Sequence, residues 1–280
     1  MSAIDVHPDI LTLMDGAYEI RRLVVEMAHQ PEGAHLGGAL SAAEILSVLF
    51  GTVLRLDPSN PEWPDRDYFV LSKGHIAAAY YAALMKRGFI PEAELGQYAQ
   101  NGSRLGGHPS HNLPGVEFST GSLGHGLSLG IGLALAARHL GKPNRTFVLM
   151  GDGELQEGTI WEAAGSAGRF DLGALTAIID RNGLQINGSV ESWLGDDNLA
   201  QRWKSFGWDV IECDGHSVAE LLTVLSPSRH PVGVPHLVIA RTVKAKGIPF
   251  MENDKRSHSV VLSEKAYQRA IAALKASRQL

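Results

Sequence analysis

The chain has 280 residues, of which 44% are hydrophobic and 20% are charged, a composition that excludes a mainly disordered protein. Its net charge of −5 leaves no basic excess for binding nucleic acid, and its single cysteine, Cys213, excludes an internal disulfide framework. No segment has the pattern of a signal peptide or a membrane span, so we expect a cytoplasmic protein. Neither a linker nor a repeat divides the sequence, and residues 1–280 are predicted to form one domain.

The first part of the chain has helical periodicity. Apolar residues at spacings of three and four predict a helix over residues 9–30, which Pro31 and Gly33 would end. Ser41 and Glu44 have the spacing of a capping box and predict a second helix that begins near Ser41.

The most apolar run, residues 123–140, is predicted to be a buried helix. Its small residues would allow close packing against another helix or at a subunit interface. Further helices are predicted at residues 157–169, 197–206, 217–225 and 263–278.

Short apolar segments bounded by glycine and polar residues predict strands between these helices. Their alternation with helices predicts a three-layer α/β/α fold with a mostly parallel sheet. In such sheets, ligands bind at the carboxyl ends of the strands. The predicted strands cover residues 67–72, 145–150, 175–179, 208–213 and 236–240.

Two polar turns follow neighbouring predicted strands. Gly151 and Gly153 flank Asp152 after one strand, and Asn182 ends the next. Because one crossover separates them, the turns are expected to be neighbours in space. A carboxylate, an amide oxygen and a carbonyl such as that of Leu184 suit Mg²⁺ shared with a diphosphate, although Ca²⁺ or Mn²⁺ could fill such a site. The alternative is a turn that binds no ligand.

The sequence Gly-Asp-Gly-Glu-Leu-Gln-Glu-Gly at 151–158, followed by residues 161–163 and 179–182, resembles the thiamine diphosphate motif of transketolases. The resemblance extends over nearly the whole chain and implies the thiamine diphosphate-binding fold. Other segments in transketolase order are Ser72–His75, Gly107–Pro109, Thr120–Gly124, Asp214–Ser217 and Arg241–Gly247.

The resemblance implies a set of residues for the cofactor and its metal. Asp152, Asn182 and the carbonyl of Leu184 would hold Mg²⁺. Residues implied to contact thiamine diphosphate are His75, Gly121, Leu123, Gly153, Glu154, Asn182, Ile186, Lys246 and His258.

The resemblance also implies which residues handle the sugar. Transfer of a two-carbon ketol unit from a ketose to an aldose needs proton transfers near neutral pH, for which histidine is suited. His35, His108 and His258 are the implied catalytic residues, and with His75 and His125 they cluster in glycine-rich loops.

The resemblance covers only the first, diphosphate-binding part of a transketolase. The pyrimidine-binding domain, with the glutamate that activates the cofactor, has no counterpart in the chain and is expected on a separate C-terminal subunit. An α2β2 assembly follows, in which Glu157 and Glu162 match acids of a proton network at the subunit interface. The substrates are expected to be phosphorylated sugars.

Two other functions remain open at this point. The alpha subunit of a 2-oxoacid dehydrogenase uses the same cofactor turn, but it usually has paired asparagines where this chain has Arg181 and Asn182. A non-catalytic subunit that binds a partner is the other, although such a protein would not need an intact metal site.

Overall fold

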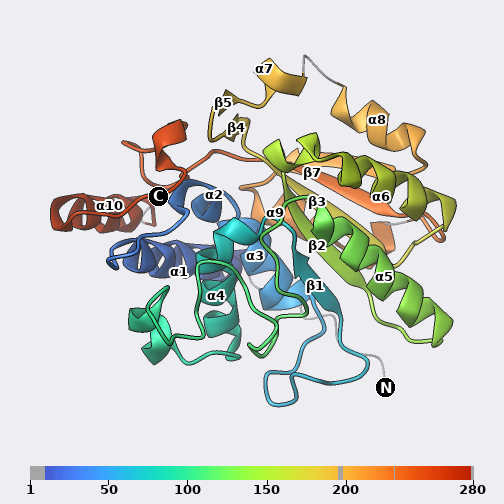
Figure 1. Cartoon of the computed structure of the whole chain (residues 1–280), viewed down its shortest axis with the longest axis horizontal. Coiled ribbons are helices and arrows are strands. Elements are labelled where there is room, and N and C mark those ends of the chain that lie inside the picture. Colours follow the sequence, from blue (N-terminus) through green and yellow to red (C-terminus); the bar gives the residue numbers. More distant parts are fainter. Residues whose placement is uncertain (1–9, 195–197, 230, 279–280) are drawn as a thin grey trace.

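The computed structural model describes residues 10–194, 198–229 and 231–278. Five parallel strands form one sheet in the order β1-β2-β3-β7-β6, with helices on both faces (Figure 1), which confirms the three-layer α/β/α fold. Each strand lies within two residues of its predicted position: β1 (Tyr68–Leu71), β2 (Thr146–Gly151), β3 (Leu175–Arg181), β6 (Asp209–Asp214) and β7 (His236–Arg241).

Two groups of helices cover opposite faces of the sheet. Helices α5, α6 and α8 cover one face, and α1 to α4 with α9 cover the other (Figure 1). None of the helices in the described part of the chain has both the length and the apolar character needed to span a bilayer. The helices are α1 (Ile10–Ala28), α2 (Leu36–Ser41), α3 (Ala43–Val48), α4 (Ala77–Arg87), α5 (His125–His139), α6 (Gly158–Arg169), α7 (Glu191–Leu194), α8 (Leu199–Ser205), α9 (Val218–Val224) and α10 (Glu264–Ser277).

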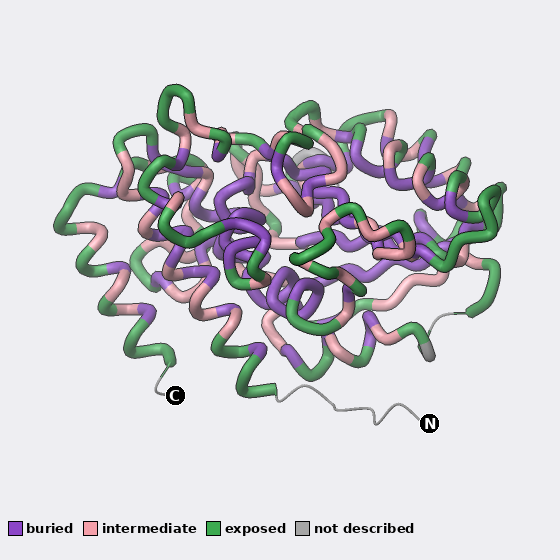
Figure 2. The backbone as a smooth tube through the Cα atoms, turned by 90° about the horizontal axis from the view of Figure 1, so that it is seen from below, coloured by how far each residue is buried: buried purple, intermediate pink, exposed green. Residues whose placement is uncertain are grey.

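The sheet separates two hydrophobic clusters. Phe147 and Leu149 of β2 belong to the cluster formed with α1 to α4 and α9, whereas Val148 and Met150 belong to the cluster formed with α5 and α6. Successive side chains of a strand point to opposite faces, so a strand covered on both sides must be apolar throughout. Figure 2 shows the result: buried backbone runs through the middle of the molecule, and exposed backbone lies along the outer helices.

The prediction that α5 is a buried helix is wrong in part. Gly126 and Gly130 lie against the sheet, where an added Cβ would come within 2.4 Å of Ser72 and of Val148 respectively. The small residues Ser128 and Gly132, however, lie on the exposed side of the helix. The glycines therefore allow α5 to pack closely against the sheet. The other face of α5 is exposed in this chain, which its apolar composition did not predict.

The predicted capping box at Ser41 is also wrong. Ser41 is the last residue of α2, and the next helix, α3, begins at Ala43 without a side-chain cap. The Ser41 hydroxyl instead donates to Asp180, and Glu44 pairs with Arg21. Both side chains bond to residues that are distant in the sequence, and the three-residue spacing between Ser41 and Glu44 could not predict these contacts.

Helix α4 was not predicted from the sequence. It is rich in alanine and almost entirely buried, so it lacks the polar face that marks an amphipathic helix. It ends at Gly88, which has a φ of 93° and caps the last carbonyls in the left-handed conformation that favours glycine.

The register of the sheet sets where the polar turns lie. Gly151 at the end of β2 is opposite Asp180 of β3, and Asp180 is opposite Ala240 of β7. The turns that follow these strands therefore lie side by side at one edge. A short hairpin of β4 (Leu184–Gln185) and β5 (Gly188–Ser189) follows β3 at this edge.

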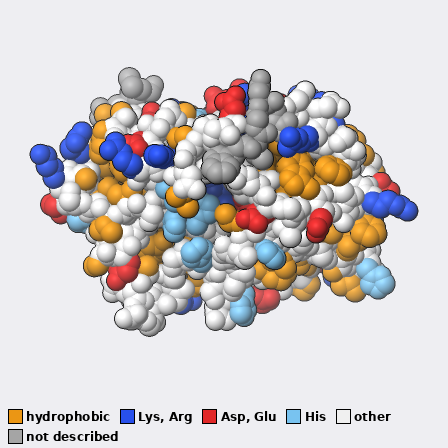
Figure 3. Space-filling model, turned by 45° about the horizontal axis from the view of Figure 1, so that its top comes forward, with side chains coloured by type: hydrophobic (Ala, Val, Ile, Leu, Met, Phe, Trp, Pro, Cys, Tyr) orange, Lys and Arg blue, Asp and Glu red, His pale blue; other side chains and the backbone are white. Residues whose placement is uncertain are grey.

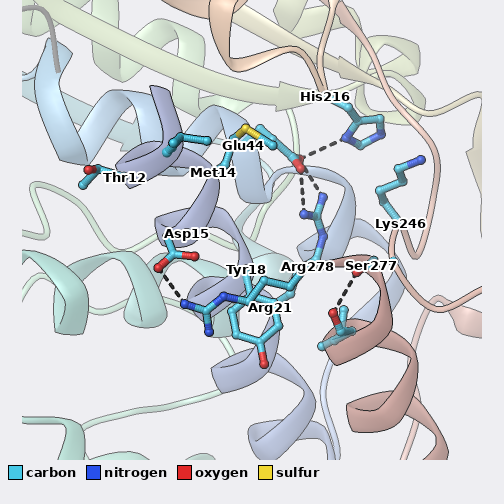
Figure 4. Close-up of a pocket in the computed structure, with 13 residues that line it drawn as sticks. Thr12, Met14, Asp15, Tyr18, Arg21, Glu44, His216, Lys246, Ser277 and Arg278 are labelled. Carbon is cyan, nitrogen blue, oxygen red and sulfur yellow. Dashed lines mark hydrogen bonds and ion pairs between the residues drawn. The ribbon is translucent and has the colours of Figure 1, made fainter. Parts of the chain in front are cut away.

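A buried ion pair joins α1 to α3. The two terminal guanidinium nitrogens of Arg21 donate to Glu44 at 2.6 Å, and His216 lies 3.0 Å from the same carboxylate (Figure 4). Burial would raise the pKa of Glu44, but the charge of Arg21 and the hydrogen bonds from His216 and Arg21 together outweigh it and lower the pKa to about 2. Glu44 therefore stabilises the fold as a carboxylate.

We predict that Glu44→Gln lowers the free energy of unfolding at pH 7 by about 3–5 kcal/mol, because it leaves Arg21 buried without its counter-charge. The pKa of Glu44 is depressed from 4.5, so its contribution is complete above pH 4.5 and is lost as the pH falls toward about 2. Urea denaturation at several pH values should show the difference between wild type and variant shrinking over that range. The control, Glu26→Gln, removes only the part-buried pair with Arg22 and should cost less than about 1 kcal/mol.

Candidate active site

The turns at the carboxyl edge of the sheet enclose a cavity of about 340 Å³. In the space-filling view, histidine side chains gather near the middle of one face (Figure 3). Most of the residues implied by the sequence line this cavity: His35, His75, Gly121, Leu123, Asp152, Gly153, Glu154, Asn182, Leu184, Ile186 and His258.

The turns after β2 and β3 are in contact, as predicted. The amide of Gly183, which has a φ of 77°, donates to Asp152 at 2.6 Å. Asn182 accepts from the amide of Leu184 at 3.1 Å, and the Leu184 carbonyl accepts from Lys244 at 3.3 Å. A carboxylate, an amide and a carbonyl thus place oxygen atoms in one cavity.

This donor set fits a hard cation such as Mg²⁺. No group of three or more His, Cys, Asp or Glu suited to a metal occurs among the described residues, so a metal here would depend on the amide and carbonyl oxygens. Burial, and then the charge of Asp180, raises the pKa of Asp152 to about 6. A bound cation would offset that cost of burying the carboxylate.

A second buried ion pair lies beneath the cavity. Lys73, at the end of β1, donates to Asp180 of β3 at 2.5 Å, and both side chains are shielded from solvent. Ser41 donates to the same carboxylate at 2.6 Å, and Thr242 donates to its other oxygen. Burial would raise the pKa of Asp180, but Lys73 and the hydroxyl donors lower it. Asp180 therefore joins α2, β1, β3 and the turn after β7.

The structure places Lys244 in the cavity and Lys246 outside it. Lys246, implied by the resemblance to lie near the cofactor, lines a separate cavity beside Arg21 and His216 (Figure 4). Lys244 is buried, and its ammonium contacts the Leu184 carbonyl and, at 3.2 Å, His258. Burial, and then Lys73, lowers the pKa of Lys244 to about 8.

The turn after β7 explains which lysine faces inward. His216 accepts a hydrogen bond from the amide of Val243 at 2.8 Å, which holds the turn from outside the cavity. Ala245 then has a φ of 61°, a conformation that non-glycine residues rarely adopt. The chain reverses at this residue, and the two lysines on either side of it face different cavities.

Three histidines form a compact cluster at the cavity. The ring of His35 lies 5.4 Å from those of His75 and His258, measured between centroids, and His75 lies 5.4 Å from His258. A two-residue bridge between Ala34 and Val260 brings the loops of His35 and His258 together. The predicted convergence of these histidines is therefore present in the fold.

Burial keeps these imidazoles neutral near neutral pH. It lowers the pKa of His75 to about 2, with a further contribution from Lys73, and that of His258 to about 4, with a further contribution from Lys244. It also lowers the pKa of His35, to which nearby His108 adds. Because the Lys244 ammonium can only donate, His258 accepts through Nδ1 and carries its proton on Nε2.

The loop over residues 120–124 forms another wall of the cavity. Thr120 donates to the carbonyl of Leu71 at 2.7 Å, and Gly124 donates to the carboxylate of Glu154 at 2.9 Å. Burial raises the pKa of Glu154, while the hydrogen bonds it accepts act in the opposite direction. Gly121 and Leu123 line the cavity between these two anchors.

Several implied residues lie at the rim or away from the cavity. His108 lies at the edge, with its ring 6.0 Å from that of His35. Ile186 is 66% exposed, and Glu157 and Glu162 are also exposed. His125 is exposed at the start of α5 and lies outside the histidine cluster, contrary to the grouping suggested by the sequence.

Reasoning from the sequence missed three charged residues: Lys73, Asp180 and Lys244. Each occurs within a segment that resembles transketolases, so the motifs marked the region but not the role. Lys73 follows β1 and Asp180 lies in β3, on the two sides of β2, so the sheet order brings together two residues that are 107 positions apart in the sequence.

Comparison with known proteins identifies similar chains. The family model described as the transketolase, thiamine diphosphate binding domain, matches residues 14–277. The chain is 43% identical over 256 residues to one of the subunits of the apulose-4-phosphate transketolase of Actinobacillus succinogenes, covering 91% of this chain and 92% of that protein. It is 38% identical over 268 residues to the SqwG subunit of the 6-deoxy-6-sulfo-D-fructose transketolase of a Clostridium species, with coverages of 94% and 96%.

A solved structure agrees with these sequence relatives. The crystal structure of transketolase from Campylobacter jejuni matches with a TM-score of 0.88 and 31% sequence identity. The match covers 94% of this chain but 42% of that one.

We predict that Lys73→Met lowers the free energy of unfolding by about 3–5 kcal/mol, because Asp180 would remain buried with only hydroxyl donors. The double variant Lys73→Met/Asp180→Asn removes both charges and should recover part of the loss. Urea denaturation of the wild type, both single variants and the double variant measures this coupling. Additive losses in the double variant would contradict it.

Proposed function

The chain belongs to the transketolase family as its N-terminal, thiamine diphosphate-binding subunit, and from this premise we propose which of its residues carry the reaction. A transketolase passes a two-carbon ketol unit from a ketose donor to an aldose acceptor. The relatives named as subunits match over nearly their whole length, which supports an enzyme made of two chains.

The observation that carries the proposal is the convergence of three kinds of group in one cavity. Oxygen ligands come from the turns after β2 and β3, the ammonium of Lys244 comes from the turn after β7, and neutral histidines lie beside them. A diphosphate with its cation needs the oxygen ligands and the ammonium, and a sugar with several hydroxyls needs the histidines.

We assign Asp152, Asn182 and the Leu184 carbonyl as ligands for Mg²⁺. No carboxylate forms an ion pair with Lys244 among the described residues, so a diphosphate oxygen would supply the missing counter-charge. Gly121 and Leu123 offer backbone groups at the opposite wall, where the aminopyrimidine would lie. When bound, thiamine diphosphate supplies the thiazolium carbon that takes up the ketol unit and releases it to the acceptor.

The histidines at the cavity are assigned to the sugar hydroxyls. A neutral imidazole can donate through one ring nitrogen and accept through the other. His258, with its proton on Nε2, can donate from that atom, while Lys244 holds Nδ1. His35 is partly exposed and adjacent, and His108 at the edge completes the set that can move protons to and from a bound sugar.

The partner is assigned the remaining half of the site. We propose that a C-terminal subunit carries the pyrimidine-binding domain and the activating glutamate, and that the enzyme is an α2β2 assembly. Exposed Glu157 and Glu162 fit a network at that interface. Phosphorylated sugars are the proposed substrates, in line with a relative named for apulose 4-phosphate.

The alternative functions receive less support. The named relatives of high coverage are transketolase subunits, so a 2-oxoacid dehydrogenase is not favoured. A non-catalytic subunit would not require Asp152, Asn182 and Lys244 to converge in one cavity.

We predict that Lys244→Met raises the Kd of thiamine diphosphate by about 10–100-fold, because it removes a charge-assisted hydrogen bond to the diphosphate. Lys246→Met is the matched control, since it removes the same charge two residues away in a different cavity, and should change the Kd by less than about twofold. Titration calorimetry of the two-subunit complex with Mg²⁺ present measures both. The opposite ranking would assign the contact to Lys246.

We predict that Asp152→Ala abolishes the increase in cofactor affinity that Mg²⁺ gives to the wild-type complex. The variant loses the charged ligand of the proposed metal set. The control Asp65→Ala removes a surface carboxylate paired with Lys142 and should leave the metal dependence intact. Equal Mg²⁺ dependence in Asp152→Ala and wild type would remove the metal assignment, and absence of cofactor binding in wild type would remove the proposed function.

A further inference from the structure

Glu154 is a buried carboxylate without an ion-pair partner in the described part of the chain. It lies in the single 3₁₀ turn Gly153–Gln156 after β2, and only 3% of its surface is exposed. Burying a carboxylate is unfavourable unless hydrogen bonds compensate it. The hydrogen bonds that Glu154 accepts must therefore compensate the burial of its carboxylate at the wall of the cavity.

Three donors from three different segments meet this carboxylate. The hydroxyl of Ser72, after β1, and the amide of Gly124, before α5, donate to Oε1, the latter at 2.9 Å. The amide of Gly151, at the end of β2, donates to Oε2 at 3.0 Å. Both oxygens are thus engaged with the protein, which leaves Glu154 as a link between segments.

The segment that depends most on this link is the loop over residues 121–123. None of its three amides donates a hydrogen bond in the described structure, so the loop is held at its ends. Thr120 anchors one end to β1. Gly124 anchors the other end through its amide, which donates to Glu154, and through its carbonyl, which accepts from the hydroxyl of Thr159 at 3.2 Å. Gly121 and Leu123 line the cavity between these anchors.

We propose that Glu154 is a positioning residue. Its carboxylate holds the 121–123 loop in the position at the cavity wall where the loop would contact the aminopyrimidine half of the cofactor. This inference rests on the proposed function and changes the implied role of Glu154 from a direct cofactor contact. In the proposed function the loop contacts the cofactor through backbone groups, and these groups can form hydrogen bonds only if the loop is held in one position.

The donor pattern requires a carboxylate at this position. A glutamine has one acceptor oxygen and one amide group, and the amide can only donate. Whichever way it turns, it places an N–H against the N–H of Gly124 or of Gly151. Glu154→Gln therefore keeps the size of the side chain but loses the hydrogen bond from one of these two amides.

The test measures hydrogen–deuterium exchange in the full chain without cofactor. In Glu154→Gln, peptides that contain Gly124 or Gly151 should exchange about tenfold faster, while peptides of α1 and α10 stay at wild-type rates. Ser72→Ala removes one donor only and should give a smaller, equally local increase. In the control Glu220→Gln, the altered carboxylate accepts a hydrogen bond from the amide of Asp214, far from the loop. Exchange in the peptides of the loop should stay at the wild-type rate.

A second measurement connects the loop to the ligand. In the two-subunit complex with Mg²⁺, Glu154→Gln should raise the Kd of thiamine diphosphate about tenfold and change that of inorganic pyrophosphate, which lacks the pyrimidine, less than twofold. Equal losses for both ligands, or unchanged exchange at Gly124 in Glu154→Gln and Ser72→Ala, would overturn the positioning role. Wild-type protein that binds neither ligand would overturn the proposed function, whereas the exchange experiment would still decide whether Glu154 fixes the loop.

Discussion

The cavity depends on the buried ion pair between Lys73 and Asp180. Asp180 is the point where α2, β1, β3 and the turn after β7 meet, because Ser41, Lys73 and Thr242 all donate to its carboxylate. The pair cannot exchange its partners for water, since both side chains are buried. The walls of the cavity are therefore fixed relative to one another before any ligand arrives, which is the preorganisation that binding a charged cofactor requires.

The same pair also influences the protonation of the buried groups at the cavity. With Lys73 neutralised by Asp180, Lys244 is the cation in the cavity that no carboxylate pairs with in the described structure. Its ammonium fixes the tautomer of His258, and burial, together with the nearby positive charges, favours neutral imidazoles at His75 and His258. Because Lys244 occupies Nδ1 of His258, this imidazole offers only its Nε2 proton, so in the proposed function the charge at the diphosphate end sets which way His258 can hydrogen-bond a sugar hydroxyl.

The sequence predicted what local patterns control. Strands buried on both faces read as short apolar runs, and a polar turn after each marks the carboxyl edge, so the contact of Asp152 with the Gly183 turn followed from the fold class. Contacts made across the sheet had no such pattern. Ser41 reads as a helix cap but binds Asp180, and the choice between Lys244 and Lys246 depends on the reversal at Ala245 and its anchor at His216.

The exposed rim of the cavity argues for a second chain. Ile186 is a large apolar side chain that lines this cavity and remains 66% exposed, and Gly121, which also lines it, is exposed as well. Burial of an isoleucine side chain is favourable by about 1.5–3 kcal/mol, so a cofactor or partner subunit that covered Ile186 would gain that free energy. The diphosphate end is enclosed by buried charges, whereas the wall that would face the reacting end of the cofactor is open. The proposed partner subunit would cover this open wall and complete the end of the site that the chain leaves exposed.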